Sequence, residues 1–465
     1  MIDYVIIGGG PCGLTIALYL SELGKKCVLI DKNENLGGCH RVTRVEDDLF
    51  TEHGPRIYSS AYYNVDTILK KIGTSWDDTF VKSKFSIGGN MLSQFSIKEM
   101  FVFGIEIFKM VLGINTKNQT VKEFADKHNF SEKTKDYMNR ICRLTDGAGD
   151  DRYSIHQFMQ LFNQNFLHTL YQPRKPNDQY LFKLWEEKLL ENNVVIFKDT
   201  DVLAINDNIV KTNFGEIICK KIVICIPPKP FLKLSQNSFI QNKSLYEIWG
   251  EANDVNISEW VEKNSYINDI PITFHWEESH ELPKIWGFPR NDWGIAFVVL
   301  TDYMKPENGY KLVISTCITI QDVKSKFTHK TVQESNREEL VSEVFRQLKA
   351  SFPSLPNPDK SIIHPKISRE NNQWVEQDTA YFKQTFIQSH TKFAENIYYV
   401  GTQNGNSYYN FTSMESAVTN ALFAVNKMEN VDICIRKPRE VVFFIRIIIV
   451  ILILILILKY KFKYS

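Results

Sequence analysis

The chain has 465 residues, more than a single domain usually holds, so about two to three domains are expected. Hydrophobic residues make up 43% of the sequence and aromatic residues 13%, which is enough for large cores. A net charge of +1 excludes the basic balance typical of nucleic-acid-binding proteins. The eight cysteines include no C-x-x-C pair, so we expect reduced thiols rather than a disulfide framework.

The first forty residues carry the most informative pattern. An apolar run at 4–7 leads into Gly8, Gly10 and Gly13, and apolar residues at helical spacing follow over 14–20. In a strand–turn–helix unit of this kind, Gly8 permits the tight turn and Gly10 leaves bare backbone beside a pyrophosphate. Gly13 lets the helix pack closely on the strand. The pattern therefore predicts a dinucleotide-binding turn.

The helix start and the next strand complete this unit. Pro11 and Cys12 open the helix, whose first N–H groups and positive dipole end favour phosphate. A second apolar run at 27–30 ends on Asp31, where a carboxylate would accept hydrogen bonds from ribose hydroxyls, with Lys32 beside it. An acid at this position argues against a 2′-phosphate and hence against NADP. We expect these residues to bind the adenosine half of a dinucleotide.

Two further turns follow within thirty residues. Gly37 and Gly38 again bring bare backbone close to a neighbour, six residues after the ribose acid. The run Gly54-Pro55-Arg56 then places a turn beside ionisable and aromatic side chains. Both turns are candidates for the same binding site.

Together these motifs resemble the FAD-dependent amine oxidase superfamily. It includes monoamine and polyamine oxidases, protoporphyrinogen oxidase and phytoene desaturase, with UDP-galactopyranose mutase a more distant relative. The family pattern adds a G-G-R/N turn and a D/E-x-G-G/P turn beside the flavin. Cys39 stands where the oxidases usually have an arginine that contacts the phosphates, and Arg41 is the candidate to replace it. The run 54–58 is closer to the G-P-H-I-F turn of the mutase.

The resemblance continues in two later blocks. It implies that Val202 offers backbone groups to the adenine edge. It also implies that Gly401 and Thr402 lie beside the pyrophosphate and ribityl chain. A helix opening at Met414 would present its first N–H groups to the N1–C2=O2 edge of the flavin. Gln403 replaces the family glutamate in this block.

Other positions bear on flavin attachment and catalysis. About twenty-eight residues before the glycine that matches Gly401, monoamine oxidases carry a cysteine that bonds covalently to FAD. The corresponding residues 372–375 include no cysteine, so the resemblance implies non-covalent FAD. Trp374 falls near the family's aromatic wall against the flavin, with a buried core position as the other interpretation. The family lysine expected near Pro271 is missing, and Lys284 is the nearest candidate. Arg56 is the third catalytic candidate.

The resemblance also implies a fold. We expect an α/β protein with a Rossmann-like FAD-binding domain of the two-dinucleotide-binding type, an interleaved α+β substrate domain and a C-terminal hydrophobic helix. The FAD-binding parts are expected at 1–75, 191–230 and 391–430. The substrate domain should comprise a mainly helical part at 76–190 and a mixed sheet at 231–390. No metal site is expected, because the polar glycine run at 146–151 lacks the ligand spacing of a calcium loop.

The last stretch predicts a membrane anchor. Residues 441–458 are almost entirely apolar and would span about 27 Å as a helix. Arg446 lies near enough to one end to snorkel. An amphipathic or buried terminal helix is the alternative. We expect the folded body to close at about Met428 and to face the cytosol, since no signal peptide precedes the first strand.

The expected function is hydride transfer from an amine or C–C bond of a small-molecule substrate to FAD, with oxygen as reoxidant. No nucleic-acid partner is expected. One alternative is a mutase-like flavoenzyme acting on a sugar nucleotide, which the 54–58 turn favours. Another is a membrane-tethered flavin-binding scaffold without turnover, since the family lysine is missing and two glycine blocks are altered.

Overall fold

The computed structural model describes most of the chain. The described ranges are 1–45, 49–52, 56–87, 92–114, 119–146, 149–263, 265–266, 270–287, 290–301, 309–376, 381–382 and 391–464. Two of the residues proposed for the cofactor site, Gly54 and Pro55, lie outside these ranges.

The larger sheet runs in the order β10-β11-β12-β1-β2-β9, with β25 also paired to β12 and β24 to β25. Strands β1, β2, β9 and β25 are parallel to β12 or to one another. They come from three separate segments of the chain. The strands are β1 (Ile2–Ile7), β2 (Cys27–Ile30), β9 (Val195–Phe197), β10 (Val202–Asn206), β11 (Ile209–Thr212), β12 (Gly215–Ile224), β24 (Thr391–Ala394) and β25 (Ile397–Tyr399).

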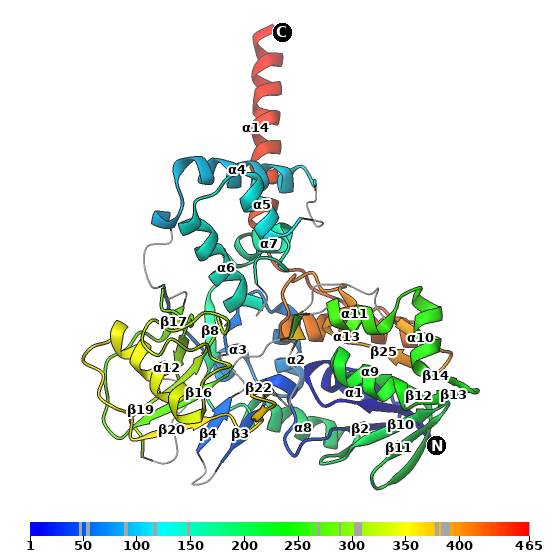
Figure 1. The fold of residues 1–465 in the computed structure, drawn as a ribbon. Coiled ribbons are helices and arrows are strands. Elements are labelled where there is room, and N and C mark those ends of the chain that lie inside the picture. The colour runs from blue at the N-terminus through cyan, green and yellow to red at the C-terminus, as the bar shows by residue number, and fades with distance from the viewer. Residues whose placement is uncertain are drawn as a thin grey trace.

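Helices cover both faces of this sheet, which is why β2 and most of β1 are apolar and buried throughout. Helices α1 (Pro11–Glu22) and α13 (Met414–Glu429) pack on one face. Helices α9 (Pro228–Gln236), α10 (Leu245–Asn253) and α11 (Ile257–Lys263) pack on the other. Figure 1 shows the two layers on either side of the strands.

A second, six-stranded sheet has the order β20-β16-β19-β18-β17-β7. Helix α12 (Arg337–Ser351) covers one of its faces with leucine and valine side chains. The strands are β7 (Phe85–Ile87), β16 (Ile272–Trp276), β17 (Ile285–Gly287), β18 (Ala296–Val299), β19 (Leu312–Cys317) and β20 (Lys360–Ile363). The opposite face carries buried polar side chains, which are described with the site.

A group of helices stands at one end of the molecule, at the foot of the C-terminal helix (Figure 1). These are α4 (Ile97–Val111), α5 (Val121–Lys127), α6 (Glu132–Asp146) and α7 (Ile155–Asn165). The C-terminal helix α14 (Val441–Tyr464) projects away from the body (Figure 1). Of the described helices, α14 alone is long and apolar enough to cross a membrane. Its apolar stretch has a mean hydropathy of 3.6, and only 6% of that stretch is buried in the protein. It is therefore not the buried terminal helix of the alternative interpretation.

Shorter elements connect these layers. They are α2 (Tyr63–Lys71), α3 (Trp76–Thr79), α8 (Leu181–Glu191), β3 (Val42–Arg44), β4 (Phe50–Glu52), β5 (Tyr58–Ser59), β6 (Phe80–Lys82), β8 (Leu170–Pro173), β13 (Phe239–Ile240), β14 (Lys243–Ser244), β15 (Ser265–Tyr266), β21 (Ile367–Glu370), β22 (Gln373–Glu376), β23 (Tyr381–Phe382), η1 (Gly38–His40), η3 (Leu92–Gln94) and η4 (Thr402–Asn404).

The folded body does not close at Met428, so that prediction is wrong. The side chain of Asn426 accepts a hydrogen bond from the backbone N–H of Ile433 at 2.7 Å and donates one to its carbonyl at 2.9 Å. The N–H of Val442, inside the first turn of α14, donates to Oδ1 of Asn163 at 2.9 Å. The segment between α13 and α14 is thus fastened to the body, because its backbone groups find partners there rather than in water.

Candidate functional site

The first glycine turn requires glycine at two positions. Gly8 has φ +109°, and a Cβ added there would lie 2.6 Å from the carbonyl oxygen of Cys225. A Cβ on Gly13 would lie 1.9 Å from the carbonyl oxygen of Gly8, because α1 packs directly over the end of β1. These contacts bring the start of α1 to the carboxyl ends of β1 and β12, the edge at which open α/β sheets bind ligands.

Gly10 leaves the N-terminus of α1 open. It is the N-cap residue, and no side chain in the described part of the chain caps this helix. Helices α4 and α12, in contrast, begin on a capping serine and a capping asparagine. A Cβ on Gly10 would have Gly38 Cα as its nearest neighbour, at an ordinary 3.7 Å. The free N–H groups and the dipole of α1 therefore point to space that an anion such as a pyrophosphate can use.

The second glycine turn lies against the first. The N–H of Gly37 donates to the carbonyl oxygen of Gly9 at 2.8 Å. Gly37 has φ +116°, and a Cβ there would meet the ring of Phe182 at 2.5 Å. A Cβ on Gly38 would lie 3.1 Å from Gly10 Cα. The two turns, separated by more than twenty residues in sequence, thus form one cradle of bare backbone.

Asp31 holds this cradle in shape. Its Oδ2 accepts a hydrogen bond from the N–H of Gly9 at 2.7 Å. Its Oδ1 accepts two from Asn33, at 2.8 Å from the backbone N–H and 2.9 Å from Nδ2. A carboxylate can accept about four hydrogen bonds, so a ribose hydroxyl would share Asp31 with the turn. The sequence predicts the contact of Asp31 with ribose but not its hydrogen bonds to the glycine turn.

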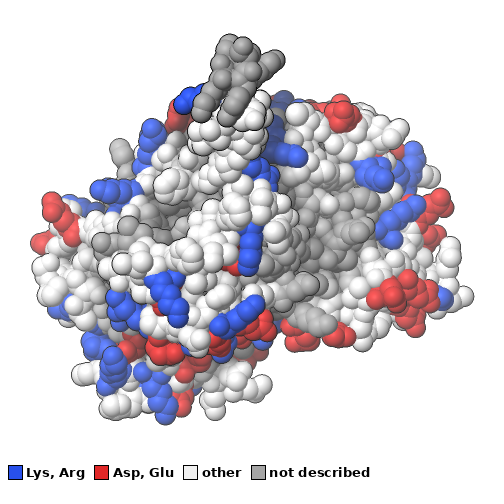
Figure 2. All heavy atoms as spheres, turned by 90° about the horizontal axis from the view of Figure 1, so that it is seen from above, with Lys and Arg blue, Asp and Glu red and all other residues white. Residues whose placement is uncertain are grey.

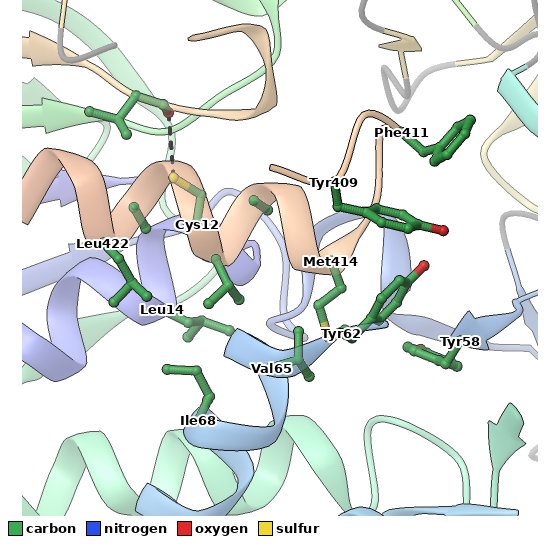
Figure 3. Close-up of a cluster of buried hydrophobic side chains, with 14 of the residues drawn as sticks. Cys12, Leu14, Tyr58, Tyr62, Val65, Ile68, Tyr409, Phe411, Met414 and Leu422 are labelled. Carbon is green, nitrogen blue, oxygen red and sulfur yellow. Dashed lines mark hydrogen bonds between the residues drawn. The ribbon is translucent and has the colours of Figure 1, made fainter. Parts of the chain in front are cut away.

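The thiol of Cys12 lies in the core between α1, β12 and β25. The side chain is buried, with Sγ 3.6 Å from the carbonyl oxygen of Val400 and 3.8 Å from Sγ of Cys225 (Figure 3). Burial raises the pKa of the Cys225 thiol well above its usual range. Cys12 therefore joins α1 to the end of β25, immediately before Gly401.

The C-terminal block approaches the cradle from the same side. The N–H of Gly401 donates to Oδ1 of Asn404 at 2.6 Å, and a Cβ on Gly401 would collide with the side chain of Gln403. Thr402 opens η4 directly after it. Met414, the first residue of α13, is fully buried near Tyr62 (Figure 3).

Ser413 caps α13. Its side chain accepts a hydrogen bond from the N–H of Ser416 at 3.1 Å, and Ser416 Oγ accepts one from the N–H of Ser413 at 2.9 Å. The two serines together form a capping box. The N–H groups of Met414 and Glu415 remain for a ligand at this end of the helix.

Arginines lie at the other side of the second turn. Arg41 donates through Nη1 to the carbonyl oxygen of Gly38 at 2.9 Å. Arg56 donates through Nη2 to the carbonyl oxygen of Cys39. The Nε of Arg56 is buried and has no hydrogen-bond partner within the described ranges. A buried donor without a partner costs free energy, so this atom suits an acceptor on a ligand.

A histidine and a tyrosine extend this side of the cradle. The Tyr58 hydroxyl lies 3.4 Å from Nδ1 of His40 and accepts a hydrogen bond from Nδ2 of Asn177 at 3.1 Å. Burial, with the neighbouring charge of Arg56, lowers the pKa of His40 well below its usual range. His40 is therefore neutral at physiological pH. His40 is not among the site residues predicted from the sequence, although it directly follows the second glycine turn and Cys39.

One face of the second sheet carries buried polar side chains that were not among the predicted site residues. Thr273 and Ser315 are opposite each other on β16 and β19, and the hydroxyl oxygens of Thr273 and Thr51 lie 3.1 Å apart. Ser315 Oγ and Nδ1 of His275 are buried and have no hydrogen-bond partner among the described residues. Burial lowers the pKa of His275 to about 4. The alternation in 272–276 predicts this face, because T-x-H places both polar side chains on one side of a strand.

The remaining candidates lie elsewhere. Trp374, on β22, is buried in the core beside α12, and its Nε1 donates to the carbonyl oxygen of Ser335 at 3.1 Å. Lys284 is exposed at the start of β17. Lys32 is exposed, and Val202 begins β10 opposite Thr212. For Trp374 the buried-core interpretation is the one that the structure supports, because its indole is packed and hydrogen-bonded there.

Comparisons with known proteins agree with this geometry. A family model for an NAD(P)-binding Rossmann-like domain matches residues 6–72. A 15-cis-phytoene desaturase from an Oncidium hybrid cultivar is 35% identical over 72 residues, which is 16% of this chain and 12% of that protein. The match thus spans about an eighth of that relative's length.

Solved structures resemble the chain over nearly its full length. Putrescine oxidase bound to putrescine has a TM-score of 0.64 at 11% identity, covering 92% of this chain and 99% of that one. Reduced UDP-galactopyranose mutase has a TM-score of 0.58 at 15% identity, covering 93% and 94%. At these identities the likeness shows a shared fold.

The family match over residues 6–72 and the parallel strands around β1 show a Rossmann-like domain at the start of the chain. More narrowly, the chain has the fold of the FAD amine oxidase-like superfamily. Both the resemblance and the fold class expected from the sequence are confirmed.

Proposed function

We propose that the protein is an FAD-dependent oxidoreductase that holds FAD without a covalent link and oxidises a small-molecule substrate. The observation that carries the proposal is the cradle of Gly10 and Gly38 at the uncapped start of α1. Such a cradle suits a pyrophosphate because the backbone can approach it closely and the helix dipole favours negative charge.

The donor set fits the rest of FAD. Asp31 would accept a hydrogen bond from the ribose while it keeps Gly9 in place. The unpartnered Nε of Arg56 and the first N–H groups of α13 would donate to acceptors of the flavin. Bound FAD supplies a ring system that accepts a hydride from the substrate. The residues of the chain bind and orient this cofactor.

The polar face of β16 and β19 is the proposed substrate side. Ser315 and the neutral His275 would offer hydrogen-bonding groups to a substrate in an otherwise apolar setting. Apolar neighbours such as Val313 and Val298 would exclude water from the reacting bond. The bond oxidised is proposed to be C–N or C–C, as the resemblance implies.

We also propose that α14 anchors the protein to a membrane in a single pass, with the body on the cytosolic side. The support is the length and hydropathy of the helix and the small buried share of its window.

The sharpest test is Gly10→Ala. Its new methyl group meets only ordinary contacts in the protein, so the apoprotein should keep its thermal stability. The same methyl would occupy the proposed phosphate position, so the FAD dissociation constant should rise by about tenfold or more. Equilibrium titration of detergent-solubilised apoprotein measures this change. Unchanged FAD affinity in a folded Gly10→Ala variant would contradict the proposed position of the pyrophosphate.

A second experiment separates the functional alternatives. The wild-type protein should release yellow FAD on acid precipitation, and its flavin should bleach anaerobically with an amine, porphyrinogen or polyene. Rearrangement of UDP-galactopyranose by the reduced protein without net oxidation would favour the mutase alternative. FAD binding with neither activity would favour the scaffold without turnover.

A further inference from the structure

Helix α4 turns its apolar side outward. Its exposed side chains are large and hydrophobic, with Phe101 70% and Phe108 57% exposed. Ile97, Met100, Gly104 and Ile105 complete this surface around a shallow, open hollow of about 560 Å³. Soluble proteins bury such a face, so its exposure indicates a non-aqueous neighbour.

The buried side of α4 carries two glutamates beside Val102 and Val111. Glu99 is 4% exposed and accepts hydrogen bonds from the backbone N–H groups of Ser96 at 2.6 Å and Ser131 at 2.8 Å. Burial raises the pKa of Glu99, but these hydrogen bonds outweigh it and lower that pKa to about 2. Glu106 is 3% exposed and pairs with Lys109. Because both carboxylates are fixed inside, α4 cannot rotate its apolar side into the body.

A contact with α14 fixes α4 at the membrane end of the molecule. Arg446 donates through Nε to the carbonyl oxygen of Val111 and through Nη2 to that of Met110, both at 2.8 Å. These carbonyls belong to the last turn of α4, where helices leave acceptors unpaired. α4 therefore crosses the foot of α14, as Figure 1 shows. Seen from this end, the surface around the foot of α14 is largely uncharged, with scattered basic and a few acidic side chains (Figure 2).

We propose that α4 lies in the interfacial plane of the bilayer that α14 crosses, with its apolar side among the upper acyl chains. The inference rests on the proposed anchor and adds a second membrane contact to it. Lipid is the occupant that the geometry favours, because the apolar face of α4 is continuous with the foot of the proposed span. Interfacial helices bind through such a buried apolar face.

Lipid photo-crosslinking of the full chain in phosphatidylcholine nanodiscs tests this inference. Phe101→p-benzoylphenylalanine and Phe108→p-benzoylphenylalanine place the probe on α4, and Leu454→p-benzoylphenylalanine places it on α14. The control is Phe214→p-benzoylphenylalanine, since Phe214 is 77% exposed in the hairpin between β11 and β12. All four side chains are exposed, so the fold should tolerate the probes.

The expected result is lipid adducts at Phe101, Phe108 and Leu454 and none at Phe214. Adducts at Leu454 alone would overturn the inference and leave the anchor standing. Adducts at the α4 positions without Leu454 would support the interfacial helix and overturn the span. Crosslinks from α4 to a second copy of the chain would show that a protein, not lipid, covers this face. Absence of adducts at all positions would overturn both proposals.

Discussion

At the scale of single residues, Asp31 combines a contact that the sequence predicts with contacts that the structure shows. Its carboxylate stands at the end of β2, where the sequence pattern predicts a contact with ribose. In the structure it also fixes Gly9 and Asn33 through three hydrogen bonds. The sequence reveals the acid but not these partners, because the direction of the Gly9 N–H depends on the folded turn.

Asp31→Ala should therefore change two quantities. The N–H groups of Gly9 and Asn33 would lose a buried, charged acceptor, which should cost about 2–4 kcal/mol of stability. FAD affinity should fall roughly tenfold to a hundredfold. Thermal unfolding of the apoprotein and FAD titration measure the two effects, with the exposed Glu34→Ala as a neighbouring control. A variant that weakens FAD without losing stability would show that the hydrogen bonds to the turn contribute little.

Glu415 makes stability depend on pH. It accepts hydrogen bonds from the N–H groups of Asn64 and Val65 at the start of α2, and burial raises its pKa to about 7. Between pH 4.5 and pH 7 the folded state then binds more protons than the unfolded state, so stability falls as pH rises through this window.

The variant Glu415→Gln should lose this pH dependence. The amide oxygen can still accept from α2, but the side chain no longer titrates. The decrease in stability between pH 5 and pH 8 should become smaller by up to about 3 kcal/mol. Thermal unfolding at the two pH values measures it, and exposed Glu216→Gln serves as control. Equal decreases in Glu415→Gln and wild type would mean that Glu415 ionises normally.

At the scale of elements, the sequence predicts the first β-α-β unit well. The apolar runs at 4–7 and 27–30 lie in β1 and β2, and the glycines fall where α1 begins. These signals are local, so they survive without tertiary information. The positions of Trp374 and Lys284 were not predictable in this way, because they depend on how the second sheet folds around α12.

The orientation of α4 is likewise not predictable from local sequence signals. Apolar spacing over 100–112 predicts an amphipathic helix, and α4 spans Ile97–Val111. Periodicity shows that such a helix has an apolar side but not what covers that side. The burial of Glu99 and Glu106 becomes visible only once Ser131 and Lys109 are placed beside them.

Two glycines in helices provide a matched comparison. Gly13→Ala would bring a methyl group 1.9 Å from the Gly8 carbonyl oxygen, so the β1–α1 junction must shift and the thermal midpoint should fall. Gly104→Ala in α4 meets nothing within 4 Å and should raise stability by about 0.5–1 kcal/mol. Differential scanning fluorimetry of both variants makes the comparison. A destabilised Gly104→Ala variant would show that this helix face is packed against something.

At the scale of the whole molecule, the end of the folded body can be found by truncation. A chain ending after Arg446 keeps the hydrogen bonds of Val442 and Arg446 and should match the thermal midpoint of the full chain. A chain ending after Glu440 loses both and should melt at a lower temperature. Both truncated forms keep α4 and should sediment with phosphatidylcholine vesicles. Equal midpoints in the two truncated chains would show that residues 441–446 do not contribute to the body.

The pairing of β1 has a consequence for the order of events during synthesis. One edge of β1 pairs with β2, whose partner residues follow within about twenty-five positions, but the other edge pairs with Cys219–Ile224. Strand β25 then joins β12 only when Ile397 has been made. On the ribosome the nascent chain therefore carries an open, apolar edge on β1 until nearly half of its 465 residues have been made. Such edges recruit other strands, so we expect folding to be slow and to need chaperones until β12 closes the sheet.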